Sequence, residues 1–182
     1  MKLLLKHLKK IDMNSNKTGK GSFLIDTMIW AYLFDREKYP KEYSNIQRRL
    51  ESLPSFARLS ISVISWGEIA VGFPDSIQTR HLEFIRSVKP SIITLDHHIA
   101  EEYGKLRGDI SKKALKRKKG LNPKDSVDRF TWLEVGSLEN DLWIAAQAIS
   151  RNLTLVTNDA MERIRKVAGE SLHIDNWAVN GK

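Results

Sequence analysis

The chain has 182 residues, of which 41% are hydrophobic, and this suits one ordinary domain with its own core. It contains no cysteine, which excludes disulfides, thiolate zinc sites and cysteine nucleophiles and favours a cytoplasmic location. The formal net charge of +8 favours polyanionic partners, because lysine and arginine neutralise phosphates and release counterions.

Residues 1–20 are predicted to be a basic extension that precedes the domain. Met1 to Ile11 mixes leucines with lysines, and its longest apolar run is too short for a signal peptide. The leucines would share one face of a helix, which leaves contact with a partner or a membrane surface as an alternative. A frayed extension without membrane association is the simpler expectation, because short isolated helices are marginal in water.

Short apolar runs and helical periodicity define the elements of the first half of the chain. The predicted elements are a strand at 22–26, helices at 27–34 and 41–53, a strand at 59–64 and a helix at 76–88. Ser65 to Glu68 has the spacing of a capping box, which predicts that Glu68 lies in the first turn of a further helix.

The second half continues the alternation. After a strand at 91–95, Asp96 is predicted to cap a helix that passes Ile110 and enters a lysine cluster. A basic insertion is expected at about 112–136, followed by a helix at 139–151, a strand at 153–157, a helix at 160–167 and an edge strand at 172–174. The domain is therefore expected to span 21–176, with a tail at 177–182.

This order of elements predicts the fold class and the place of the site. Strands that alternate with helices indicate an α/β fold, in which helices cover both faces of a central, mostly parallel sheet of four to five strands. In such three-layer α/β/α folds the functional site lies beyond the carboxyl ends of the strands, at the switch point of the sheet.

Four acidic residues are placed to meet at that edge. Asp26 ends the first strand, Glu68 follows the second, Asp159 follows the fourth, and Asp141 opens the helix that precedes the fourth. Each one alone is explained by capping of a helix start. Together they would repel one another unless a cation compensates, and oxygen ligands suit Mg²⁺ or Mn²⁺.

A carboxylate site that holds such a metal can hydrolyse phosphodiesters. Thr27, Thr157 and Asn158 adjoin the acids, and their side chains would fix the carboxylates or metal-bound water, or else serve ordinary turn and capping roles. The basic cluster is read either as a solvated face or as an RNA contact. Its residues are Lys112, Lys113, Lys116, Arg117, Lys118 and Lys119.

The sequence motifs around the four acids also resemble a known family. They are LIDTMIW at Asp26, ISWGEIAVG at Glu68, ENDLWIAAQAI at Asp141 and LVTNDAMERI at Asp159. Over residues 22–175 the chain resembles PIN-domain nucleases, most closely VapC-type toxins of type II toxin–antitoxin systems.

The resemblance implies a PIN-like fold and an Mg²⁺- or Mn²⁺-dependent endoribonuclease, in which the four acids bind metal and Thr157 is an accessory hydroxyl. It also implies a homodimer and a cognate antitoxin whose tail lies near the acids.

Several alternatives remain open from the residues alone. Met28 stands where the family often has asparagine, and the same residue leaves a phosphatase without its second aspartate. Glu139 competes with Asp141 for the metal, and Asp96-His97-His98 is read as a helix cap rather than a zinc site. A housekeeping RNA-processing PIN nuclease and an inactive RNA- or protein-binding PIN module are the competing functions.

Overall fold

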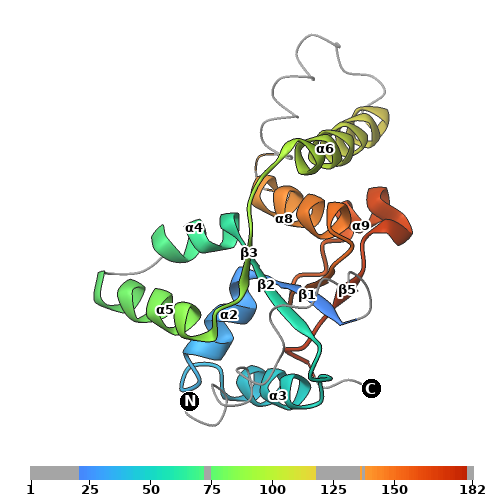
Figure 1. The fold of residues 1–182 in the computed structure, drawn as a ribbon. Helices are drawn as coiled ribbons and strands as arrows, with labels where there is room; N and C mark the ends of the chain where they lie inside the picture. The colour runs from blue at the N-terminus through green and yellow to red at the C-terminus, as the bar shows by residue number, and fades with distance from the viewer. Residues whose placement is uncertain (1–20, 72–74, 118–135, 137, 180–182) are drawn as a thin grey trace.

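The computed structural model describes residues 21–71, 75–117, 136 and 138–179. They form an α/β fold around a five-stranded sheet with the strand order β3-β2-β1-β4-β5, and every neighbouring pair is parallel (Figure 1). This confirms the predicted fold class. The strands are β1 (Ser22–Ile25), β2 (Arg58–Ser62), β3 (Ser91–Ile93), β4 (Thr154–Val156) and β5 (Ile174–Asp175).

Helices connect these strands at bounds close to the predicted ones. They are α2 (Thr27–Phe34), α3 (Pro40–Glu51), α4 (Val63–Val71), α5 (Asp75–Val88), α6 (His97–Arg117), α8 (Glu139–Ser150) and α9 (Glu162–Ala168), with a 3₁₀ turn at Gly169–Ser171. In the described part of the chain, no helix combines the length and the apolar character that a bilayer crossing requires.

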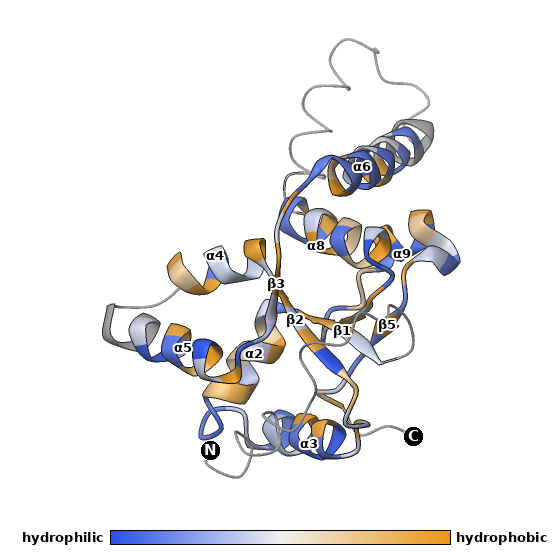
Figure 2. Ribbon diagram, viewed as in Figure 1, coloured by the Kyte–Doolittle hydropathy of each residue, from blue (hydrophilic) through white to orange (hydrophobic). Residues whose placement is uncertain are grey.

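Alternation along β1 sends side chains to a separate core on each face of the sheet. Phe23 and Ile25 pack with α2, α3, α4 and α5, whereas Leu24 packs with α6, α8 and α9. Figure 1 shows these two groups of helices on opposite sides of the strands, and Figure 2 shows apolar ribbon concentrated at the centre. Both faces of the central strand β1 are therefore covered by helices.

The start of α4 differs from the prediction. The helix begins at Val63, and Ser62 Oγ accepts the backbone N–H of Ile64 at 2.9 Å, so Ser62 provides the cap. Ser65 is instead buried inside the helix, and Glu68 lies in its second turn. The capping-box prediction was wrong because the helix begins three residues earlier, after Ser62, so that Ser65 and Glu68 lie inside it.

The structure also differs from the prediction at the basic cluster and at the C-terminal tail. Residues 112–117 belong to α6 rather than to a loop, while Lys118 and Lys119 lie outside the described residues, as does most of the expected insertion. Trp177 is 2% exposed and joins the first core, so the packed domain continues past residue 176. The predicted extension at 1–20 also lies outside the described residues.

Candidate active site

Asp26 and Thr157 meet at the switch point of the sheet, where strand order reverses between β1 and β4. The Asp26 backbone N–H donates to the Val156 carbonyl at 3.0 Å, which continues the β1–β4 pairing to the carboxyl edge of the sheet, called the rim below. Its carboxylate is buried and accepts two hydrogen bonds, from the Thr27 backbone N–H at 2.7 Å and from Thr157 Oγ1 at 2.8 Å. Asp26 is thus both the cap of α2 and a fixed acid on the rim.

Asp159 is held beside Asp26 through the same threonine. Thr157 Oγ1 accepts the Asp159 backbone N–H at 3.0 Å while it donates to Asp26. Asp159 Oδ1 accepts the backbone N–H of Met161 at 2.7 Å, and Met161 has a left-handed φ of 45°. The predicted accessory hydroxyl therefore bonds to one acid and to the backbone of a second, and the tight turn after β4 orients Asp159.

Glu68 connects three helices at the rim. Its Oε2 accepts a hydrogen bond from Thr27 Oγ1 of α2, and its Oε1 accepts one from Asn140 Nδ2 of α8 at 2.7 Å. Asn140 was not predicted, and no local signal marks it, because its role depends on how α8 packs against α4. Both oxygens of Glu68 are therefore held in place by neutral hydrogen-bond donors.

Asp141 is the least stabilised of the four carboxylates. Within the described residues it accepts no hydrogen bond, although it is half-buried at the start of α8. Burial and then the charges of Asp26, Asp159 and Glu68 raise the pKa of Asp141 to about 6. Burial also raises the pKa of Asp26, opposed by its bonds to Thr157 and Thr27 and reinforced by Glu68 and Asp159. The four acids therefore share one electrostatic site.

The chemistry of this donor set fits a divalent metal. Across the described ranges, no three acidic or histidine side chains stand in an arrangement that would hold an ion as they are. The acids nevertheless supply only oxygen ligands, and the charged groups that raise the pKa of Asp141 are all carboxylates. Hard cations such as Mg²⁺ and Mn²⁺ prefer oxygen ligands and would offset this repulsion.

The side chains of other predicted residues bond to partners other than the four acids. Asn158 donates to Tyr32 Oη at 3.0 Å and accepts from Asn176 Nδ2 at 3.0 Å, so both ends of its amide are bonded to residues other than the four acids. Glu139 accepts a hydrogen bond from Tyr103 of α6. Lys112 pairs with Asp109 at 3.2 Å, and nothing described joins it to the acids.

Comparison with known proteins agrees with this architecture. The model of the PIN domain family matches residues 23–170. The chain is 25% identical to a chain in the crystal structure of VapBC2 from Rickettsia felis bound to a DNA fragment from their promoter, with a TM-score of 0.58 over 86% of this chain and 98% of that one.

A chain in the structure of VapBC-1 from nontypeable Haemophilus influenzae is 22% identical, with a TM-score of 0.57 over 87% of this chain and 99% of that one. No curated protein matches. Because the family match covers most of the chain and includes all four acids, the chain belongs to the PIN domain family.

Proposed function

We propose that this protein is a metal-dependent endoribonuclease that cleaves RNA phosphodiester bonds. PIN domains are generally nucleases, and the observation that carries the proposal is the uncompensated state of Asp141. A half-buried carboxylate that receives no donor from the described part of the chain, and that is repelled by three other acids, is costly to a folded protein. Strained acidic clusters of this kind are typical of sites whose charge is balanced by a ligand.

In this proposal different residues orient the four acids. Asp26, Asp141, Asp159 and Glu68 would hold Mg²⁺ or Mn²⁺, which supplies positive charge against the scissile phosphate and lowers the pKa of the attacking water. Thr157 keeps Asp26 and Asp159 in fixed orientations, and Thr27 and Asn140 do the same for Glu68. Asp141 is the acid left free to adjust to the ion.

The toxin role rests on the likeness to the VapBC2 complex of Rickettsia felis. By this likeness the protein would act as the toxin of a toxin–antitoxin pair, form a homodimer and be inhibited by a cognate antitoxin. Growth arrest on expression, relieved by co-expression of a small DNA-binding protein encoded immediately upstream, would support the toxin role. Metal-dependent RNA cleavage without growth arrest would favour a housekeeping nuclease.

RNA cleavage by the purified protein tests the enzyme itself. Cleavage should require Mg²⁺ or Mn²⁺, and Asp26→Asn and Asp141→Asn should each lower it more than about 100-fold, since loss of a residue that only orients a ligand already costs about 10- to 100-fold. Asp109→Asn is the matched control, because Asp109 is an exposed acid on α6 that pairs with Lys112. Cleavage that persists in EDTA, or that survives both substitutions, would contradict the proposal.

A further inference from the structure

A pocket of about 400 Å³ lies between α3 and the segment that follows β5, and we call it the α3 pocket. Its volume is within the range of sites that hold small ligands. Asn45 Nδ2 donates to the Ala178 carbonyl at 2.8 Å and so joins the two walls. None of the four acids is among the described residues that line it. Its polar lining consists of Asn45, Arg48, Arg49, Ser52, Asp175 and Asn176.

The lining of the α3 pocket has more basic than acidic groups. It contains two guanidinium groups, of Arg48 and Arg49, and one carboxylate, of Asp175. A single oxygen of that carboxylate accepts hydrogen bonds from Arg49 Nη2 at 3.2 Å and from the indole Nε1 of Trp177 at 2.8 Å. Trp177 is buried, so Asp175 is fixed by the core and in turn orients Arg49.

The ion pair leaves Arg49 accessible to an anion. The side chains of Arg49 and Asp175 are 50% and 35% exposed, and ion pairs with this exposure contribute little to stability. A guanidinium has five N–H donors, and the bond to Asp175 uses one of them. An anion that enters the pocket can therefore bind a guanidinium that is already oriented.

Backbone and side-chain bonds join the α3 pocket to the rim. The Asp175 carbonyl accepts the backbone N–H of Thr157 at 3.1 Å, and Asn176 Nδ2 donates to Asn158 Oδ1 at 3.0 Å. Thr157 Oγ1 in turn donates to Asp26 at 2.8 Å. Because neighbouring strands are about 4.8 Å apart, the wall of the pocket lies one strand spacing from Thr157.

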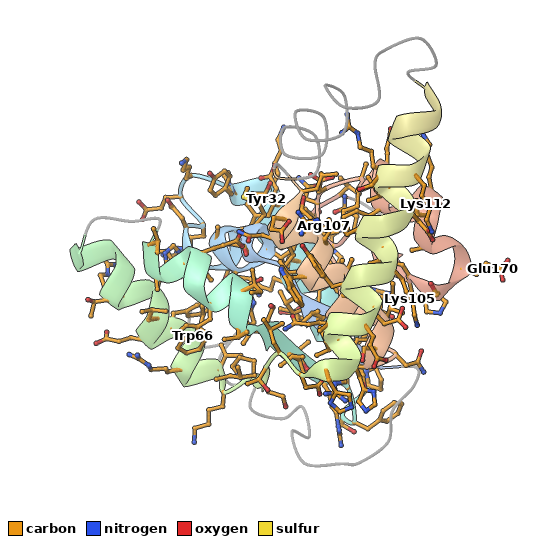
Figure 3. All side chains as sticks on the ribbon, turned by 90° about the horizontal axis from the view of Figure 1, so that it is seen from above. Tyr32, Trp66, Lys105, Arg107, Lys112 and Glu170 are labelled. Atoms are coloured by element: carbon orange, nitrogen blue, oxygen red, sulfur yellow. The ribbon has the colours of Figure 1, made fainter. Side chains whose placement is uncertain are left out.

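The pocket and the acids lie on opposite faces of the sheet at this same edge. Asp175 is in register with Val156, which packs in the core that includes α3, whereas Asp141 lies on α8 in the other core. Asn158 stands between them, since it bonds Asn176 of the pocket and Tyr32 of α2, which is labelled in Figure 3. A strand of RNA that leaves the acids reaches the pocket by crossing the rim at Asn158.

From these observations we infer that the α3 pocket binds a phosphate of an RNA nucleotide that flanks the scissile phosphodiester. The inference rests on the proposed function. A polyanion held at four carboxylates needs positive charge elsewhere along its path, and a guanidinium matches phosphate oxygens in bidentate fashion. An acidic protein segment would also suit the arginines, but the bonds between the pocket and the turn that carries Asp159 favour RNA.

Steady-state cleavage of a short RNA tests the pocket. Arg49→Ala should raise KM about three- to tenfold, the value of a partly exposed charge-assisted hydrogen bond, while kcat stays within about twofold. Arg48→Ala should raise KM in the same direction. Lys41→Ala removes an exposed charge from α3 outside the pocket, and Lys105→Ala removes one from α6 on the opposite face (Figure 3). Both controls should stay within about twofold, and a KM equal to theirs in Arg49→Ala would overturn the inference.

Asp175→Asn gives a prediction of the opposite sign. The substitution removes the carboxylate that competes with phosphate for Arg49, and it keeps an oxygen that accepts the Trp177 indole N–H. KM should therefore fall about twofold. If Asp175→Asn and Arg49→Ala raise KM equally, the ion pair has only a structural role and the pocket does not bind phosphate.

RNA binding measured in EDTA separates this inference from the proposed function. The slope of log K against log salt should fall by about 0.7 in Arg49→Ala and remain unchanged in Lys41→Ala. In an NMR spectrum, the indole N–H signal of Trp177, assigned with Trp177→Phe, should move on addition of adenosine monophosphate. If the wild type does not cleave RNA, the proposed function fails, and the salt titration still decides whether the pocket holds RNA. A polyglutamate peptide that moves the Trp177 signal when RNA does not would overturn the inference and assign the pocket to an acidic protein segment.

Discussion

At the residue scale, the four acids of the rim are held in unequal ways. Asp26 accepts two hydrogen bonds and Glu68 accepts two, so their charges are stabilised by oriented donors. Asp141 is half-buried but accepts no hydrogen bond from the described residues. The difference follows from position, since Asp26 is the N-cap of α2 and accepts the Thr27 amide, whereas Asp141 lies inside the first turn of α8.

Asp141 should therefore destabilise the metal-free protein at neutral pH. Its pKa rises from 3.8 to about 6 on folding, so between these values the folded state binds more protons than the unfolded state, and stability falls as pH rises through this window. Asp141→Asn should be more stable than wild type by roughly 1 kcal/mol at pH 8 in EDTA, a figure reduced for solvent screening of a half-buried group.

Urea unfolding at pH 4 and pH 8 measures this effect. The gain should be absent or small at pH 4, where the wild-type carboxyl is protonated, and Asp109→Asn should show no comparable gain. An Asp141→Asn protein that is less stable than wild type at pH 8 would mean that the carboxylate has a stabilising partner. A gain in stability together with lost cleavage is the expected signature of a strained functional residue.

At the element scale, the start of α4 determines where Glu68 points. Because the helix begins at Val63, Glu68 lies in the second turn and reaches across to α2 and α8. A start three residues later would place Glu68 in the first turn, where its carboxylate would bond the free amides of its own helix. The cap at Ser62 thus frees Glu68 for the site.

The two serines of this segment give a matched test. Ser62→Ala removes the acceptor for the Ile64 N–H and should lower the free energy of unfolding by about 1 kcal/mol. Ser65→Ala should be neutral or stabilising, because Ser65 Oγ is buried and finds no hydrogen-bond partner among the described residues. Chemical denaturation of both variants measures the difference, and a larger loss in Ser65→Ala than in Ser62→Ala would restore the capping box.

At the scale of the whole molecule, the switch point arises from two cores that share one sheet. From β1 the sheet extends in one direction through β2 to β3 and in the other direction through β4 to β5. The site forms where β1 and β4 lie side by side, with Asp26 and Thr157 just past their ends. The end of the described chain supports this arrangement, since Trp177 packs edge-on against Phe23 of β1 at a centroid distance of 5.0 Å.

Truncation tests where the domain ends. A chain that stops at residue 176 loses Trp177 from the first core and also the Ala178 carbonyl that accepts Asn45 Nδ2 at 2.8 Å. Its unfolding free energy should fall by about 3–5 kcal/mol, as for removal of a buried tryptophan. A chain that stops at residue 179 is the control and should unfold close to wild type. Equal thermal midpoints for the two truncations would show that Trp177 is a tail residue.

Much of this protein is determined by local sequence. Apolar runs at the strands, helical periodicity and the acids that follow each strand predicted the α/β fold and the edge that carries Asp26 and Asp159. These features depend on near neighbours in the chain, because strand and helix periods and turn chemistry are short-range properties. The four motifs together also led to the PIN domain family, which the family match confirms.

Tertiary structure alone decided the contacts between distant segments. The bond from Asn140 to Glu68 joins residues 72 positions apart, and that from Thr157 to Asp26 joins residues 131 apart. Hydrogen bonds between side chains depend on relative placement to within a few tenths of an ångström, which no local pattern encodes. The acids were thus visible in the sequence, whereas their unequal support became apparent only in the folded chain.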